Sequence, residues 1–305
     1  MWSGMAQPPI LARTADALRS LIPRRFRTDL PVVPVVRLTG VIGFTTPLKP
    51  GLTLATCGRS LDRAFGTRKA RAVGLLINSP GGSPVQSHLI FKRVRALAEE
   101  KKLPVIAFVE DVAASGGYML ACAADEIVCD PASIVGSIGV IGATFGFPEA
   151  MKKLGIERRV YTAGEHKSTL DPFLAENEHD VSRLKAIQQD IHRMFIGLVR
   201  ERRGARLTGP DDTLFSGEYW VAETAKNFGL VDQLADVRSF LRQRFGENVI
   251  MTPVPVERSL FGRRTPGVAG IALEGLLGLG TEPRALIDEV ISALEARAIW
   301  ARFGL

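Results

Sequence analysis

Ser115 is the first residue whose type and setting could perform nucleophilic chemistry. It lies in the segment Ala-Ala-Ser-Gly-Gly-Tyr at residues 113–118, where an apolar strand pattern gives way to a helical one. A serine at a helix N-terminus has the helix dipole and the N–H of Gly116 beside it, and both would stabilise negative charge on a bound carbonyl oxygen. The alternative interpretation is that Ser115 only caps the helix.

A serine nucleophile needs a base, and Lys167 is the best candidate in this sequence. It lies in Ala-Gly-Glu-His-Lys-Ser at residues 163–168, just after a predicted strand. A lysine can serve as a general base when burial and neighbouring positive charge lower its pKa to about 7–8. The alternative interpretation is an exposed loop lysine. The histidines are weaker candidates, since they are isolated in the sequence and form no HExxH motif: His88, His166, His179 and His192.

A glycine-rich turn could complete such a site. The segment Asn-Ser-Pro-Gly-Gly-Ser at residues 78–83 follows an apolar run and precedes a helical pattern. Paired glycines let the backbone turn tightly and present N–H groups to an oxyanion or a phosphate. A plain strand-to-helix turn is the alternative. The sequence contains no GxxxxGK[ST], and it has no GxGxxG at this turn, so a Walker loop and a dinucleotide fingerprint are both excluded here.

The elements that must position these residues alternate between strand and helix. Short runs rich in Val and Ile have the character of buried strands: 32–38, 73–78, 105–110, 126–130 and 158–162. Helical patterns follow them at 52–65, 84–100, 114–124 and 148–154, then a long helix at 176–203 and short helices at about 221–228 and 236–245. This alternation predicts an α/β fold with a largely parallel sheet.

Composition bounds the function. The chain has 305 residues, of which 46% are hydrophobic and 23% charged, so most of it is not intrinsically disordered. The net charge of +7 is compatible with an anionic partner or with a solvated basic surface. Aromatic residues are only 7%, so stacking platforms for nucleic acid are scarce, and we expect no nucleic-acid partner. Three cysteines without a CxxC pair disfavour a disulfide framework and a structural zinc site, and we expect no cofactor and no metal.

Both ends of the sequence have the character of attachments to a core. We divide the chain into a basic amphipathic N-terminal extension (1–31), a core (32–245), and a C-terminal extension (246–305) with a helix over 284–301. No stretch reaches the ~18 apolar residues that span a bilayer, and no secretory pattern is seen. We therefore expect a cytoplasmic protein, or one peripheral on the inner membrane through its N-terminal helix. That helix could equally pack on a neighbouring subunit.

Five motifs in order carry a resemblance to a known family. The motifs are NSPGG, AASGGY, VGSIGV, AGEHKS and LFSGEYW. Over roughly residues 32–245 this set resembles the signal peptide peptidase A (protease IV) and SohB family of bacterial serine peptidases. The resemblance implies a crotonase/ClpP-like spiral of ββα units in the core. It further implies that Ser115 is the nucleophile, Lys167 the general base, and Ser137 the serine that orients the lysine. Gly82 and Gly116 match the two N–H donors of the oxyanion hole.

The function that the resemblance implies is that of a serine endopeptidase with a Ser-Lys dyad. It would act through an acyl-enzyme on signal peptides or on other short or unfolded peptides, without a cofactor. The resemblance also implies a ring-like homo-oligomer in which a neighbour could complete the catalytic groove, a contact that the C-terminal helix would suit. Members of the family are anchored by an N-terminal span, and this sequence departs from that pattern. Two alternatives remain: a crotonase-type acyl-CoA enzyme, which would not need Ser115 and Lys167 together, and a non-catalytic membrane-associated scaffold.

Overall fold

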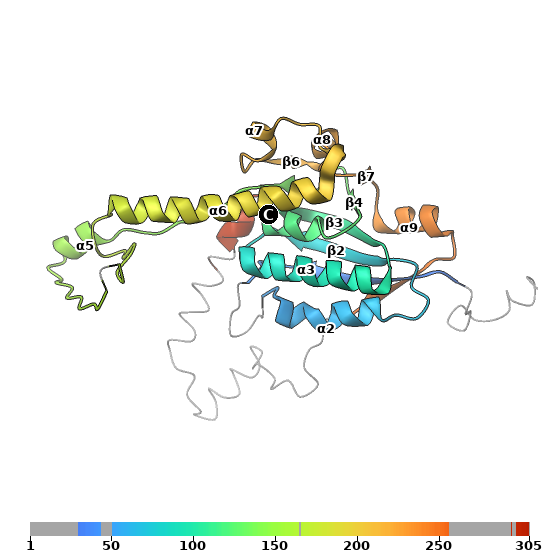
Figure 1. Ribbon diagram of the computed structural model, residues 1–305, viewed down its shortest axis with the longest axis horizontal. Coiled ribbons are helices and arrows are strands. Elements are labelled where there is room, and N and C mark those ends of the chain that lie inside the picture. Colours follow the sequence, from blue (N-terminus) through green and yellow to red (C-terminus); the bar gives the residue numbers. More distant parts are fainter. Residues whose placement is uncertain (1–29, 44–50, 165, 256–293, 295–296, 305) are drawn as a thin grey trace, which may run out of the picture.

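One sheet of eight strands organises the part of the chain that the computed structural model describes, namely residues 30–43, 51–164, 166–255, 294 and 297–304 (Figure 1). The strand order is β6-β5-β3-β2-β1-β8, with β4 beside β3 and β7 beside β4. The strands are β1 (Val32–Thr39), β2 (Val73–Ser79), β3 (Val105–Ala114), β4 (Glu126–Cys129), β5 (Ile134–Gly136), β6 (Tyr219–Val221), β7 (Gln233–Leu234) and β8 (Ile250–Val254). The helices are α2 (Leu54–Phe65), α3 (Pro84–Lys101), α4 (Gly116–Ala121), α5 (Pro148–Lys153), α6 (Glu178–Arg203), α7 (Asp211–Leu214), α8 (Ala222–Asn227) and α9 (Val237–Phe245).

The predicted α/β class is confirmed. Strands β1, β2 and β3 pair in parallel and are joined by α2 and α3, so the first half of the chain is a run of strand–helix–strand units. Only β5 and β6 pair antiparallel among the described strands. This mixed sheet with helices fits the crotonase- and ClpP-like fold that the resemblance implies. Because parallel strands end at the same edge, the turns after β2 and β3 meet there.

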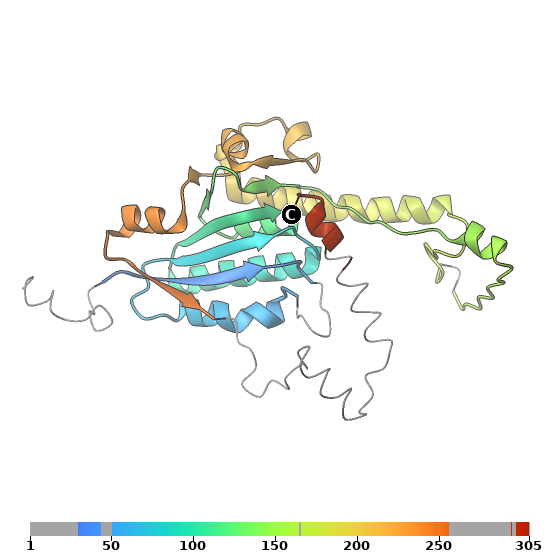
Figure 2. The ribbon, with the colours of Figure 1, turned by 180° about the vertical axis from the view of Figure 1, so that it is seen from behind.

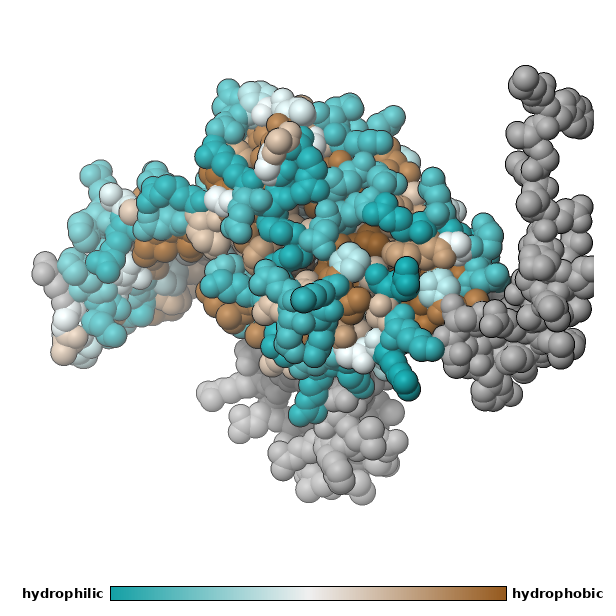
Figure 3. Space-filling model, turned by 45° about the vertical axis from the view of Figure 1, so that its right-hand side comes forward, coloured by the Kyte–Doolittle hydropathy of each residue, from teal (hydrophilic) through white to brown (hydrophobic). Residues whose placement is uncertain are grey.

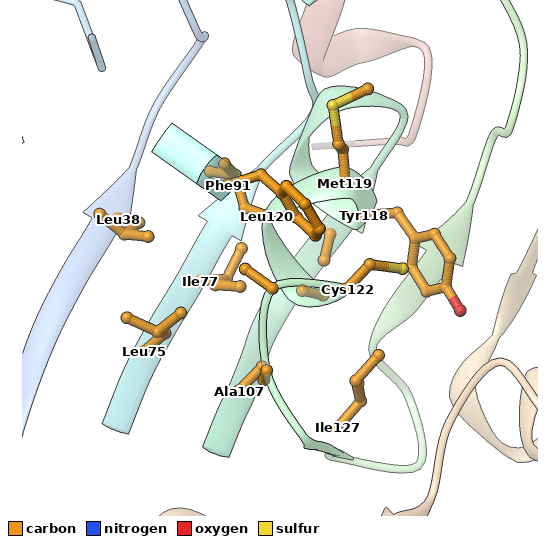
Figure 4. Close-up of a cluster of buried hydrophobic side chains, with 14 of the residues drawn as sticks. Leu38, Leu75, Ile77, Phe91, Ala107, Tyr118, Met119, Leu120, Cys122 and Ile127 are labelled. Carbon is orange, nitrogen blue, oxygen red and sulfur yellow. The ribbon is translucent and has the colours of Figure 1, made fainter. Parts of the chain in front are cut away.

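Two apolar layers hold the sheet between its helices. The larger contains strand residues together with α2, α3 and α4, and Figure 4 shows side chains of this layer, among them Leu38, Ile77, Phe91 and Met119. The smaller lies on the opposite face, where Phe240 of α9 packs against Phe108 at a ring separation of 5.5 Å. Figure 2 shows that opposite face, with α2 and α3 behind the strands. The layering follows from strands that are apolar on both faces.

A buried ion pair ties the end of α6 to the sheet. Arg203 is 2% exposed and donates both terminal nitrogens of its guanidinium to the carboxylate of Asp232, at 2.8 and 2.9 Å. Its Nε donates to the carbonyl of Gly229, and Asp232 also accepts from the backbone N–H of Ile127 at 2.7 Å. Because Ile127 lies in β4, this network holds the C-terminal end of α6 against the sheet.

The other end of α6 projects away from the sheet together with α5 (Figure 1). We call the described residues from 144 to 190 the arm. Many of its large apolar side chains are exposed: Phe145, Phe147, Leu154, Ile156, Val160, Tyr161, Phe173, Leu174 and Ile187. Some of its aromatic rings pack on each other, and Phe147 lies 5.6 Å from Phe173. Brown apolar surface is visible along the lower side of the arm in Figure 3.

The prediction of a strand at 158–162 is wrong. These residues lie in the arm in irregular backbone, and all of them are exposed. A strand needs a partner for its backbone hydrogen bonds, and no described strand pairs with this segment. Its adjacent β-branched and aromatic residues, Val160, Tyr161 and Thr162, have strand propensity, but no described strand lies beside them. The other four predicted strands are found at β1, β2, β3 and β4, with β3 reaching Ala114.

The two predicted extensions fall largely outside the described residues. The amphipathic helix of residues 1–31 and most of the helix predicted at 284–301 lie there. Strand β8 pairs in parallel with β1, so the sheet continues beyond the predicted core boundary at 245. Residues 297–301 are helical, and Tyr219 donates its hydroxyl to the carbonyl of Arg302 at 3.0 Å, which docks this segment beside β6. Among the described residues, no helix combines the length and the apolarity that crossing a bilayer requires.

Candidate active site

Ser115 occupies the sharp turn between β3 and α4. Its φ is +52° and its ψ −121°, a conformation that residues with a Cβ rarely adopt. Its side chain makes no capping hydrogen bond, which contradicts the interpretation that it only caps the helix. Its backbone is held on both sides, because its N–H donates to the carbonyl of Gly136 and its carbonyl accepts from Met119. The turn therefore leaves the hydroxyl uncommitted and half-exposed.

The glycine-rich turn after β2 lies against Ser115. A Cβ on Gly81 would come within 2.8 Å of the Cβ of Ser115 and 3.0 Å of the nitrogen of Gly116. A Cβ on Gly82, whose φ is +138°, would come within 2.2 Å of the carbonyl oxygen of Ile42. Both positions thus require glycine, because another backbone segment lies where the side chain would be.

The two predicted oxyanion donors have no competing acceptor. Within the described part of the chain, neither the N–H of Gly82 nor that of Gly116 donates to a protein atom. Gly116 begins α4, where the first N–H groups of a helix have no partner inside it. Donors of this kind can bind the oxygen of a tetrahedral intermediate.

Ser137 is brought beside Ser115 by the pairing of β3 with β5. Ala114 pairs with Gly136, so the residue that follows each of them lies at the same end of the two strands. Ser137 also has a positive φ, +53°, and its N–H donates to the carbonyl of Glu218 at 2.6 Å. The ring of Trp220 fills the place where a side chain on Gly136 would stand, at 2.9 Å from it. The VGSIGV and LFSGEYW motifs therefore meet at this turn.

These residues line one pocket of about 590 Å³ at the carboxyl edge of the sheet. Ser115, Ser137 and Gly82 contribute to its wall, with Ser216 and Gly217 from the turn before β6. The C-terminal segment forms another side through Ile299, Arg302 and Phe303. Figure 1 shows the C-terminus next to α6 and the end of the sheet, in agreement with this lining. The size and the polar hydroxyls suit a peptide side chain and its backbone.

Lys167 does not line this pocket. It lies in the arm, in the segment between α5 and α6, and its side chain is exposed. Its N–H donates to the carbonyl of Gly164 at 3.3 Å, and the space beside Gly164 is filled by the stem of the lysine itself. Within one chain, the structure therefore brings together Ser115, Ser137, Gly82 and Gly116, and it places Lys167 apart from them.

His192, considered above only as a weaker candidate for the base, lines the pocket. It projects from α6, and its Nε2 lies 3.0 Å from the carbonyl oxygen of Ile138, which follows Ser137. A signal for this position exists in the sequence: His192 precedes the buried Phe195 and Val199 at helical spacing on the same stripe. Histidine on such a stripe faces the protein, and here it contacts the loop that carries Ser137.

Comparison with known proteins identifies the family. The model of peptidase family S49 matches residues 97–244. A putative protease of Methanocaldococcus jannaschii is 32% identical over 229 residues, covering 74% of this chain and 70% of that protein. This chain belongs to peptidase family S49. The chloroplastic serine protease SPPA of Arabidopsis thaliana is 28% identical over 233 residues, 73% of this chain and 33% of that protein, so the predicted family is confirmed.

A longer relative of this S49 chain bears a different name. A protein of Brucella abortus named as a Na(+)/H(+) antiporter NhaA is 51% identical over 293 residues. The match covers 94% of this chain but 39% of that protein. The S49 chain thus corresponds to well under half of that relative's length.

Proposed function

We propose that this S49 chain is a serine endopeptidase that hydrolyses peptide bonds with Ser115 as nucleophile and Lys167 as general base. The observation that carries the proposal is the hydroxyl of Ser115, held at a positive φ beside the N–H groups of Gly82 and Gly116, all three without a partner among the described residues. Signal peptides and other short or unfolded peptides are the proposed substrate class, as the resemblance to the signal peptide peptidase family implies. Membership of a peptidase family supports the same reading.

The proposed reaction assigns one step to each of these groups. Neutral Lys167 takes the proton of the Ser115 hydroxyl as its oxygen attacks the scissile carbonyl. The N–H groups of Gly82 and Gly116 bind the oxyanion of the tetrahedral intermediate. The lysine then returns the proton to the leaving amine, and an acyl-enzyme remains on Ser115. Water, activated by the same lysine, hydrolyses the ester and restores both groups. Ser137 would hold the amine of the lysine and direct its lone pair.

We propose further that Lys167 reaches Ser115 from a neighbouring chain in a homo-oligomer. Two observations support this arrangement. Lys167 lies in the arm rather than in its own chain's pocket, and the arm exposes large apolar side chains over much of its length. Apolar surface of this extent is typical of a protein contact. A second copy seated on the arm would cover it and would bring one chain's lysine to the other chain's serine.

Labelling and turnover test the chemistry. A fluorophosphonate probe is expected to modify Ser115 in the full chain, and Ser115→Ala is expected to abolish both labelling and cleavage of a fluorogenic peptide. Ser216→Ala is the matched control, because Ser216 lines the same pocket while its hydroxyl already donates to Thr213. Labelling of a residue other than Ser115 would overturn the assignment, and so would turnover that survives Lys167→Ala.

Mixing two inactive variants tests the source of the lysine. Co-expressed Ser115→Ala and Lys167→Ala chains are expected to regain cleavage, since a mixed assembly pairs an intact serine with an intact lysine. Ser115→Ala with Ser137→Ala is the matched control. Ser115 and Ser137 both line the pocket of their own chain, so every chain in this mixture has a damaged pocket, whichever neighbour it meets. If Ser115→Ala and Lys167→Ala chains are shown to form mixed assemblies and these remain inactive, Lys167 does not reach Ser115 from a neighbouring chain.

A further inference from the structure

Two histidines that are isolated in the sequence lie together in the arm. His166 precedes Lys167, and His179 lies in the first turn of α6 beside Asp180. Their imidazole rings are stacked, with centroids 5.0 Å apart and planes inclined by 21°. One donor atom from each of His166, His179 and Asp180 lies within 4.8 Å of the other two. Three metal-ligating side chains from two separate segments therefore converge on one point.

The setting of Asp180 prepares it as a ligand. Its side chain is only 15% exposed, and its Oδ2 accepts from the N–H of Leu170 at 3.4 Å. Its Oδ1 lies 3.7 Å from Nδ1 of His179. One carboxylate oxygen is thus held by the segment after Lys167, and the other faces the imidazoles. Hydrogen bonds that orient a ligand in this way are typical of metal sites.

The charge balance also permits a cation here. The N-terminus of a helix carries partial positive charge, which by itself disfavours a metal ion. In α6 the first turn contains two carboxylates, Glu178 and Asp180, which offset it. The imidazoles of His166 and His179 are exposed enough to rotate.

We propose that His166, His179 and Asp180 bind a divalent transition-metal ion of the zinc class. Two imidazole nitrogens and one carboxylate oxygen are a donor set that suits Zn²⁺, whereas Ca²⁺ and Mg²⁺ prefer oxygen ligands throughout. Ligands at about 2.0–2.1 Å around a tetrahedral ion stand roughly 3.3 Å apart, so rotation of the two imidazoles closes the present separations. A water molecule takes the fourth position.

Metal binding would join the segment that carries Lys167 to the first turn of α6. His166 is the neighbour of Lys167 in the chain, so the bound ion fixes the backbone next to that lysine. The ion acts here as a positioning group and takes no part in the chemistry. This step rests on the proposed role of Lys167, whereas the metal site itself does not.

The binding arm of the test uses the full chain after removal of metals with a chelator. Zn²⁺ is titrated in competition with a chromophoric chelator, and Co²⁺ serves as a spectroscopic probe through its visible absorption. One equivalent per chain is expected, and His166→Ala or His179→Ala is expected to weaken affinity by about tenfold or more. His179→Cys, which keeps a zinc ligand, is expected to restore it. His88→Ala on α3 is the control and is expected to bind as the unmodified chain does.

Two outcomes overturn the site: the absence of saturable binding, or equal affinity in the chain that carries both His166→Ala and His179→Ala. A second readout follows cleavage by trypsin after Lys167, which Zn²⁺ is expected to slow in the unmodified chain but not in His179→Ala. Protection that is equal in both would also contradict the proposal. Ser115→Ala is expected to bind Zn²⁺ normally, so failure of the metal site and failure of the peptidase assignment give different results.

Discussion

The position of the Ser115 side chain depends on neighbouring glycines, which have no side chain of their own. The turn holds this serine at a positive φ, and Gly81 lies against it so closely that a Cβ there would meet the Cβ of Ser115 at 2.8 Å. Strain of this kind costs of order 1–3 kcal/mol and persists only where the surroundings enforce it. The site therefore needs the glycines for its backbone geometry and the serine for its hydroxyl.

At this scale we predict that Gly81→Ala abolishes peptide cleavage. The new methyl group would meet Ser115 Cβ at 2.8 Å and the carbonyl of Ala114 at 2.9 Å, and the φ of +103° disfavours any side chain. We expect a loss of about 1–3 kcal/mol in the free energy of unfolding, measured with urea, together with loss of fluorophosphonate labelling.

Gly197→Ala is the control for that change. Gly197 lies inside α6, and apart from the neighbouring backbone of the helix no described atom stands within 4 Å of the place its Cβ would take. This substitution is expected to stabilise the protein by about 0.5–1 kcal/mol, because alanine has the lower entropy cost in a helix. A Gly81→Ala chain with normal turnover would contradict our account of the turn.

At the scale of the element, the two ends of α6 lie in different environments. One end is buried through Arg203 and Asp232, and the other extends into the arm. Burial on its own would raise the pKa of Asp232, but the hydrogen bonds and the charge of Arg203 outweigh it and lower that pKa. The pair therefore contributes stability above the ordinary carboxyl pKa of about 3.9, and that contribution is lost as the pH falls through the lowered value.

We predict that Asp232→Asn destabilises the fold by about 3–5 kcal/mol at neutral pH, since it leaves Arg203 buried without its counter-charge. As the pH falls below the ordinary carboxyl pKa of about 3.9, the unfolded chain takes up a proton at Asp232 more readily than the folded protein does, so the gap in stability between the two chains is expected to narrow. Urea unfolding at about pH 7 and at about pH 3 measures both values. Asp190→Asn is the control, because Asp190 pairs with Arg193 on the exposed side of α6 and such pairs contribute about 0–1 kcal/mol. A gap that stays constant with pH would contradict this linkage.

The elements also show what sequence patterns can predict and what they cannot. The apolar runs at β1, β2 and β3 are local signals, and the predicted starts of these strands agree with the observed ones. The run at 158–162 has the same local pattern without a partner strand, and pairing is not a local property. The short strand β6 and the strand β8 were missed for the same reason, because each exists through a partner distant in the chain.

In the candidate site, too, local sequence patterns predict some features, and the packing of distant elements decides the others. The glycine turn and Ser115 were each placed after a strand and before a helix by local patterns, and the parallel pairing of β2 with β3 brings the two turns together. The contact of His192 with the loop after Ser137 depends on the direction of α6, which no local pattern specifies. The meeting of His166 with His179 depends on how the segment between α5 and α6 folds back. The dyad of Ser115 and Lys167 remains a prediction.

At the scale of the whole molecule, the proposed contact between copies of the chain lies on the arm. We predict that Phe145→Ser combined with Tyr161→Ser lowers the oligomeric state and the peptidase activity together. These side chains are 79% and 89% exposed, so their loss is expected to leave the monomer folded. Sedimentation velocity gives the oligomeric state, and circular dichroism verifies the fold.

Leu89→Ser is the control for the arm. Leu89 lies on α3 and is 40% exposed, but it stands outside the arm. We expect it to leave both the assembly and the turnover unchanged. If the arm variant kept the oligomeric state of the unmodified chain, the arm would not be the contact between copies.

The long helix α6 has a mechanical consequence. Its 26 residues make a lever about 39 Å long at 1.5 Å per residue. The fulcrum is the buried Arg203, and the segment that carries Lys167 is at the far end. A tilt of only about 5° at the fulcrum displaces the tip of such a lever by about 3 Å, roughly the length of a hydrogen bond. Small changes in packing near Asp232, remote from the pocket, would therefore be magnified into larger displacements of the segment that carries Lys167.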